Sequence, residues 1–167
     1  MSRPKFELHE LDASYVGKAL AKAERYRLLN WPVEAESICL DILAVEPDNA
    51  EALQLIVLAV ADQFLDQGSA PRVRQAMAWA NKVTDEYERT YLIGIIHERE
   101  GWAHLSRGFH DSFAYECFAD AMEWFDKAEK LAPPGEQEAA LRYNSCVRTI
   151  EREKLEPRAD EGELPLE

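Results

Sequence analysis

The chain has 167 residues, the usual size of a single domain, and 47% of them are hydrophobic, enough for a substantial core. Its 32 Asp and Glu residues outnumber 19 Lys and Arg residues, which gives a formal net charge of −13. Cationic side chains bind nucleic acids and anionic lipid surfaces, so this charge argues against nucleic acid and membrane as partners and favours a basic protein or peptide.

The periodicity of apolar residues, interrupted by turn residues, predicts seven helices and no strand, so the expected fold class is all-α. The expected helices cover residues 14–29, 32–46, 50–65, 71–84, 86–105, 112–131 and 136–154. Residues 1–13 are expected to be an extended arm whose Phe6, Leu8 and Leu11 can dock on the first helix. Residues 14–155 then form the helical domain, and the acidic residues 156–167 form a disordered tail.

The third expected helix, EALQLIVLAVADQFL at residues 51–65, is apolar on nearly every face. Between Leu53 and Ala61 only Gln54 is polar. The segment is too short to cross a bilayer, which takes about 20 apolar residues. A helix of this kind is buried between neighbours or lines an apolar groove, so we expect it to be the central layer of a helical stack.

The three cysteines indicate a reducing environment. Cys39, Cys117 and Cys146 are far apart and form no CxxC pair, which favours reduced, buried thiols. Residues 1–14 contain no apolar segment of the kind found in secretory signals. We therefore expect a cytoplasmic location.

Two of the expected helices share a spacing of small and large residues before a helix-ending proline. The residues are Ala35, Cys39, Ile42 and Pro47 in one helix, and Ala121, Phe125, Ala128 and Pro133 in the other. This pattern resembles the tetratricopeptide repeat (TPR), a helix–turn–helix unit of 34 residues whose second helix contains A-x₃-F…P. The resemblance covers residues 14–152 as three repeats and a last solvating helix, although the intervals between the repeats exceed 34 residues.

The resemblance implies a right-handed superhelical stack of antiparallel α-hairpins, with a concave groove lined by the first helix of each hairpin. Mapped onto this chain, the groove would contain Leu20, Glu24, Arg27, Leu28, Leu55, Leu58, Asp62, Glu98, Arg99, Trp102 and Leu105. It further implies a non-enzymatic interaction module or adaptor that binds a peptide or helix there. Members that clamp a peptide carboxylate use Lys and Asn where this chain has Leu20 and Glu24, which disfavours that ligand. The alternative is a structural homo-oligomer, such as a homodimer, whose groove is filled by its own chain or a second copy.

One cluster of residues suggests chemistry. His97, Glu100 and His104 lie at i, i+3 and i+7, so one helix face presents two imidazoles and a carboxylate, which are metal-binding groups. The chain has no HExxH motif and no evident second helix with ligands, so a hydrogen-bonded cluster facing the partner helix is favoured over a metal site or an enzyme built on these residues. The phosphate-binding and dinucleotide-binding loops are also missing, so we expect no enzymatic activity and no cofactor.

Overall fold

The computed structural model describes residues 5–66, 69–108 and 111–159. Over these ranges the chain is helical and contains no strand, which confirms the all-α prediction. A short 3₁₀ helix, η1, covers Ala13–Tyr15. The α-helices are α1 (Val16–Leu28), α2 (Pro32–Val45), α3 (Ala50–Ala61), α4 (Ser69–Ala80), α5 (Glu86–Ser106), α6 (Asp111–Leu131) and α7 (Glu138–Glu153).

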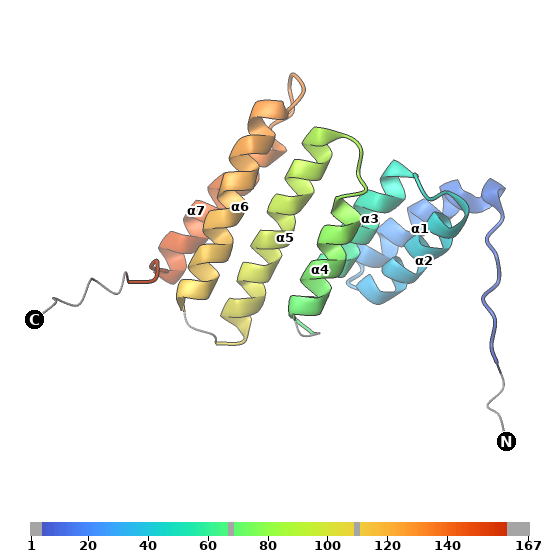
Figure 1. Ribbon diagram of the computed structural model, residues 1–167, viewed down its shortest axis with the longest axis horizontal. Coiled ribbons are helices and arrows are strands. Elements are labelled where there is room, and N and C mark those ends of the chain that lie inside the picture. Colours follow the sequence, from blue (N-terminus) through green and yellow to red (C-terminus); the bar gives the residue numbers. More distant parts are fainter. Residues whose placement is uncertain (1–4, 67–68, 109–110, 160–167) are drawn as a thin grey trace, which may run out of the picture.

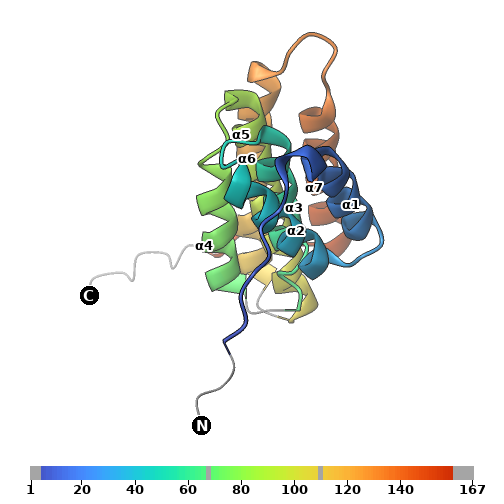
Figure 2. The same cartoon turned by 90° about the vertical axis from the view of Figure 1, so that its right-hand side faces the viewer.

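The helices form an elongated stack in which each helix packs against the next one along the chain (Figure 1). Successive helices are joined at alternate ends and therefore run antiparallel (Figure 1). In the turned view the α1–α2 pair lies in front of the rest of the stack (Figure 2). In addition, α1 contacts α3 and α3 contacts α5, so these odd-numbered helices form a continuous layer.

Side-chain caps define the beginnings of several helices. The Asn49 side chain accepts a hydrogen bond from the N–H of Ala52 at the start of α3, and Asp85 accepts one from Glu88 at the start of α5. Such caps satisfy backbone donors that have no partner within the helix. The turn between α1 and α2 places Asn30 at φ 61°, a left-handed conformation that Asn tolerates better than most residues.

Helix α3 ends earlier than the sequence pattern predicts. After Ala61 the backbone tightens, and the N–H of Gln63 donates to a carbonyl three residues earlier. The Gln63 side chain is buried and donates to the Glu36 carboxylate at 2.6 Å, while Arg72 of α4 donates to the same carboxylate at 2.8 Å. This largely buried network favours the turn over a further turn of helix, because it satisfies polar groups brought together from α2, α4 and the segment after α3.

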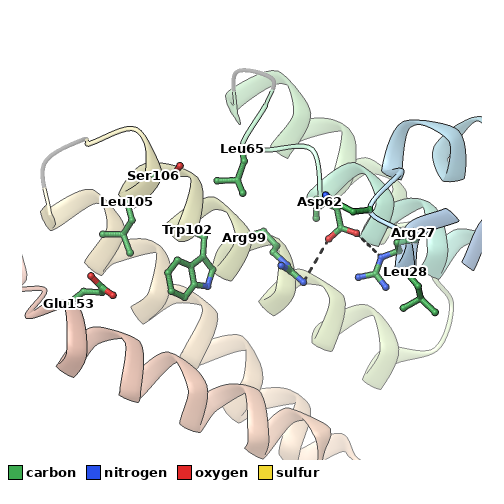
Figure 3. Close-up of a pocket in the computed structure, with 11 residues that line it drawn as sticks. Arg27, Leu28, Asp62, Leu65, Arg99, Trp102, Leu105, Ser106 and Glu153 are labelled. Atoms are coloured by element: carbon green, nitrogen blue, oxygen red, sulfur yellow. Dashed lines mark ion pairs between the residues drawn. The ribbon is translucent and has the colours of Figure 1, made fainter. Parts of the chain in front are cut away.

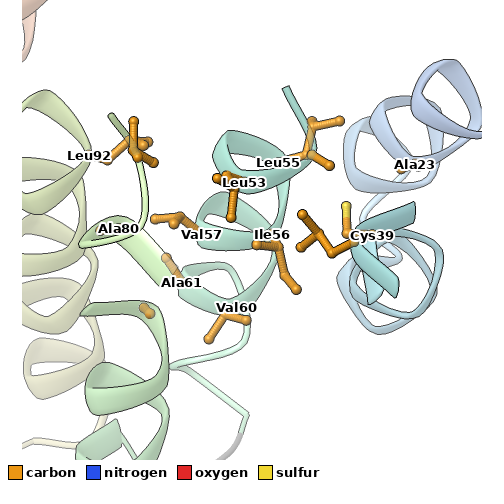
Figure 4. Close-up of a cluster of buried hydrophobic side chains, with 14 of the residues drawn as sticks. Ala23, Cys39, Leu53, Leu55, Ile56, Val57, Val60, Ala61, Ala80 and Leu92 are labelled. Carbon is orange, nitrogen blue, oxygen red and sulfur yellow. The ribbon is translucent and has the colours of Figure 1, made fainter. Parts of the chain in front are cut away.

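The centre of the stack is α3, as predicted, because it contacts α1, α2, α4 and α5. Its Leu53, Ile56, Val57 and Val60 are at most 3% exposed and lie among side chains of the flanking helices (Figure 4). Cys39 of α2 is buried in the same cluster. Burial raises the pKa of its thiol to about 12, so the thiol is protonated and unreactive at neutral pH.

Helices α5 and α6 approach each other closely at two glycines of α5. A Cβ atom at Gly94 would lie 2.6 Å from the Phe125 ring, and one at Gly101 would lie 3.0 Å from the Phe118 ring. Both phenylalanines are fully buried. The two glycines are seven residues apart, as are the two phenylalanines, so each ring of α6 occupies a notch on the same face of α5.

The N-terminal arm docks less than the sequence suggests. Leu11 packs against the core, but Phe6 and Leu8 are 90% and 93% exposed. The arm lies beside Asp41 and Val45 of α2 rather than on α1, because a small cavity is lined jointly by these residues and the arm. Phe6 and Leu8 are therefore not docked on α1, and of the three apolar residues of the arm only Leu11 packs against the core in the described structure.

The C-terminal end of the folded body is Leu155, which is buried in the cluster formed by α5, α6 and α7. The following residues, 156–159, are exposed, and the rest of the expected tail lies outside the described residues. Among the described helices, none combines the length and apolar character needed to cross a bilayer.

The glycine notch makes a direct prediction for stability. Gly94→Ala should destabilise the protein by about 1–2 kcal/mol, because overpacking a core costs about 1–3 kcal/mol and the better helix propensity of Ala returns at most about 1 kcal/mol. Chemical denaturation would measure the change. Phe125→Leu should lower the free energy of unfolding less in the Gly94→Ala background than in the wild type, because the smaller side chain leaves room for the methyl group.

Gly17 of α1 is the matched control, since nothing lies within 4 Å of a Cβ placed there. Gly17→Ala should therefore stabilise the protein by roughly 0.5–1 kcal/mol. If Gly94→Ala stabilises the protein to the same extent, α5 and α6 do not touch at this point.

Candidate binding groove

Two neighbouring cavities, of about 800 Å³ and about 450 Å³, open on one face of the stack. They share Arg27 and Arg99 as lining residues, so they adjoin, and we call them together the groove. All of the lining residues come from α1, α3, α5 and α7 and from the turns that follow α1 and α3. The groove is therefore formed by the odd-numbered helices, with α7 added to the layer of α1, α3 and α5.

One carboxylate holds the two shared arginines in place. Asp62, at the end of α3, lies between Arg27 of α1 and Arg99 of α5 (Figure 3). Its oxygens are 2.8 Å from Arg27 Nε and 3.8 Å from an Arg99 guanidinium nitrogen. All three side chains are at least 65% buried, so solvent screens the ion pairs less than it would on an open surface.

Trp102 is the aromatic side chain of the larger cavity. Its ring packs edge-on against the Phe118 ring, with 5.6 Å between the two ring centres. The Arg152 guanidinium of α7 lies 5.8 Å from the centre of the Trp102 ring. Both contacts restrict the orientations that the indole adopts before any ligand arrives. Beside it, Leu28 and Leu65 are 75% and 51% exposed, so the cavity offers apolar surface around a rigid aromatic ring.

The smaller cavity is bounded by α7, and its Arg142 forms an ion pair with a buried carboxylate behind the lining. Glu98 is only 3% exposed, and its carboxylate lies 3.2 Å from an Arg142 guanidinium nitrogen. Burial raises the pKa of Glu98, while Arg142 and Arg99 act in the opposite direction. Leu141, one position away on α7, is 65% exposed and lines the same cavity.

The charge of the groove differs from that of the whole molecule. Three arginines line it, and they are balanced by three carboxylates, in a chain whose net charge is −13. The cations are Arg27, Arg99 and Arg142, and the anions are Asp62, Glu138 and Glu153. The groove is thus a neutral, partly apolar region on an acidic molecule.

The structure brings seven of the eleven expected groove residues into this lining. They are Arg27, Leu28, Leu58, Asp62, Arg99, Trp102 and Leu105. Leu20 and Leu55 are instead 8% exposed and belong to the core cluster. Glu98 is also buried, against Arg142, and Glu24 is exposed outside the groove.

Sequence reasoning missed the contribution of α7. It treated this helix as a solvating end, whereas Glu138, Leu141, Arg142 and Ser145 line the smaller cavity and Glu153 lines the larger one. Their spacing of three and four residues was a signal that one face of the helix turns inward. Nothing in the sequence indicated that Arg142 would meet the carboxylate of Glu98.

The expected trio of His97, Glu100 and His104 is only partly assembled. His104 Nε2 lies 3.7 Å from a Glu100 carboxylate oxygen, one helical turn away on α5. The third group that converges on this pair is Cys117 of α6, and His97 is outside the group. The converging groups are therefore Glu100, His104 and Cys117 rather than the expected His97, Glu100 and His104.

Comparison of the chain with models of known protein families, with characterised proteins and with solved structures finds no match. The tetratricopeptide resemblance accordingly remains an expectation drawn from the residue pattern. The groove is therefore interpreted from its own geometry and chemistry.

The buried carboxyl of Glu98 predicts a pH dependence. Because its pKa in the folded protein is raised, the native state holds the proton more tightly than the unfolded state does. Its contribution to stability is therefore present at low pH and is lost as the pH rises from about 4 through the raised pKa. A glutamine side chain cannot ionise, so the stability of Glu98→Gln relative to the wild type should increase as the pH rises above about 4.

Denaturant titrations over a pH series would measure this difference. Glu51→Gln is the control for the substitution itself, because Glu51 is exposed on α3 and its replacement should change the free energy of unfolding by less than about 0.5 kcal/mol. A flat difference for Glu98→Gln would mean that Arg142 compensates the buried charge completely.

Proposed function

We propose that the protein is a non-enzymatic interaction module whose groove binds an amphipathic peptide or helix of another protein. The observation that carries the proposal is the combination of a preoriented Trp102 with exposed leucines around open space. Aromatic side chains held in a fixed orientation contribute strongly to protein interfaces, because little conformational entropy is lost on binding.

The lining favours a ligand with both apolar and polar side chains. Leu28, Leu65 and Leu105 provide apolar contacts along the larger cavity. Asp62 and its two partners, Arg27 and Arg99, provide fixed charges of both signs at the junction of the two cavities. Outside the groove, the charge of −13 attracts a basic partner over long distances and would increase its association rate at low salt.

A second copy of the chain is the alternative occupant. The turn between α1 and α2 carries exposed apolar side chains beside the groove, with Leu29 62% exposed and Trp31 60% exposed. Contiguous exposed apolar surface of this kind marks interaction sites. The mass of the protein in solution separates the two occupants, because a self-filled groove requires a dimer or larger oligomer.

Leu28→Glu and Leu141→Glu test the groove from its two ends. Both side chains are mostly exposed, so each change should alter the free energy of unfolding by less than about 0.5 kcal/mol. Binding should fall at least tenfold, because a charge would be placed in the contact surface. Affinity purification with the wild-type protein identifies the candidate partners, and titration of a purified partner measures the loss.

Leu40→Glu is the matched control, since Leu40 is 47% exposed on α2, which contributes nothing to the described lining of the groove. Partners held by the groove are retained by Leu40→Glu and lost from the other two variants. A partner retained by all three variants binds elsewhere and contradicts the proposal. If Leu28→Glu instead converts an oligomer into a monomer, the groove is filled by a second copy.

A further inference from the structure

The Glu100, His104 and Cys117 cluster brings three metal-binding groups of different chemistry together. A carboxylate oxygen, an imidazole nitrogen and a thiol sulfur all lie within 4.8 Å of one another. Two of the groups come from α5 and one from α6, and their side chains are partly buried, with 24% of Glu100 and 19% of His104 exposed. Zinc lies about 2.0–2.3 Å from each of its ligand atoms. An ion placed at the centre of the cluster would need only a small shift of the three side chains to reach these distances.

We propose that Glu100, His104 and Cys117 form a binding site for a divalent zinc-class metal ion that joins α5 to α6. A sulfur, a nitrogen and an oxygen ligand suit zinc or cobalt, whereas magnesium and calcium prefer oxygen ligands alone. On coordination the Cys117 thiol loses its proton to solvent and binds as the thiolate. Three protein ligands leave the remaining position of a tetrahedral ion to water.

The electrostatic surroundings favour a cation. Glu116 and Asp120 of α6 join Glu100 in surrounding the sulfur with negative charge. Burial and this charge raise the pKa of the Cys117 thiol to about 12 in the metal-free protein, so a metal must displace a tightly held proton. The same acidic surroundings attract a divalent ion, which reverses the sign of the local field once bound.

The site is independent of the groove. Residues on an α-helix are about 100° apart, so Glu100 and His104 are each about 200° from Trp102 and lie on the opposite face of α5. The core that holds α5 to α6 is apolar and includes the Phe118 and Phe125 rings. The metal therefore adds stability to a chain that folds without it, and loss of metal binding would not contradict the proposed function.

The test uses the full chain, prepared with a metal chelator and a non-thiol reductant and then dialysed. Titration with Co²⁺ should produce a sulfur-to-cobalt charge-transfer absorption at one equivalent, and Zn²⁺ should displace it. Zn²⁺ should also raise the melting temperature, since a ligand that binds only the native state stabilises it, whereas Mg²⁺ should not. Circular dichroism should show the same helix content before and after metal is added.

Cys117→Ser and His104→Gln should each lower zinc affinity by more than about tenfold, because changing even a group that only hydrogen-bonds to a metal ligand costs about 10–100-fold. Cys117→Ser should also abolish the charge-transfer absorption. Two variants are used so that a folding defect in one leaves the other informative.

Cys146→Ala and His97→Ala are the controls. Cys146 is a buried cysteine of α7 outside the cluster, and His97 belongs to the trio expected from sequence. Both variants should bind zinc as the wild type does. The proposal is overturned if the wild type shows no charge-transfer absorption and no thermal shift, if binding survives in both ligand variants, or if His97→Ala abolishes it.

Discussion

The interaction on which the structure most depends is the contact between α5 and α6 at Gly94 and Gly101. Only a residue without a Cβ allows the rings of Phe125 and Phe118 to approach the α5 backbone so closely. Interiors are packed nearly as densely as organic crystals, so such a contact leaves little freedom in the position of one helix on the other. Helix α5 is consequently a rigid element in the C-terminal half of the stack.

The geometry of both candidate sites depends on this contact. Phe118, which occupies the notch at Gly101, is the ring against which Trp102 packs edge-on in the groove. Its neighbour in the chain, Cys117, meets Glu100 and His104 on the other side of α5. Helix α5 thus contributes Trp102 to the candidate groove on one face, and Glu100 and His104 to the cluster with Cys117 on the other.

Electrostatics distinguish the groove from the rest of the surface. Most acidic side chains of the molecule face solvent, where their charge is hydrated and screened. In the groove Asp62 is shared by two arginines, and Arg142 of the lining is paired with the buried Glu98. Removing one partner from such pairs would leave a partly buried charge uncompensated, so these pairs constrain the arrangement of α1, α3, α5 and α7 as well as the charge of the groove.

The amino-acid sequence by itself determined the helices, most of their ends and the central position of α3, because apolar periodicity, caps and prolines act over a few residues. The tetratricopeptide resemblance further predicted that Arg27, Asp62, Arg99 and Trp102 line a groove, and these four residues do line the described cavities. Only the tertiary structure decided that Leu55 and Glu98 are covered, that α7 closes the groove, and that Cys117 replaces His97 beside His104. These outcomes depend on how closely and at what rotation separate helices pack, and that distance is set by contacts such as Gly94 with Phe125, which connect residues far apart in the chain.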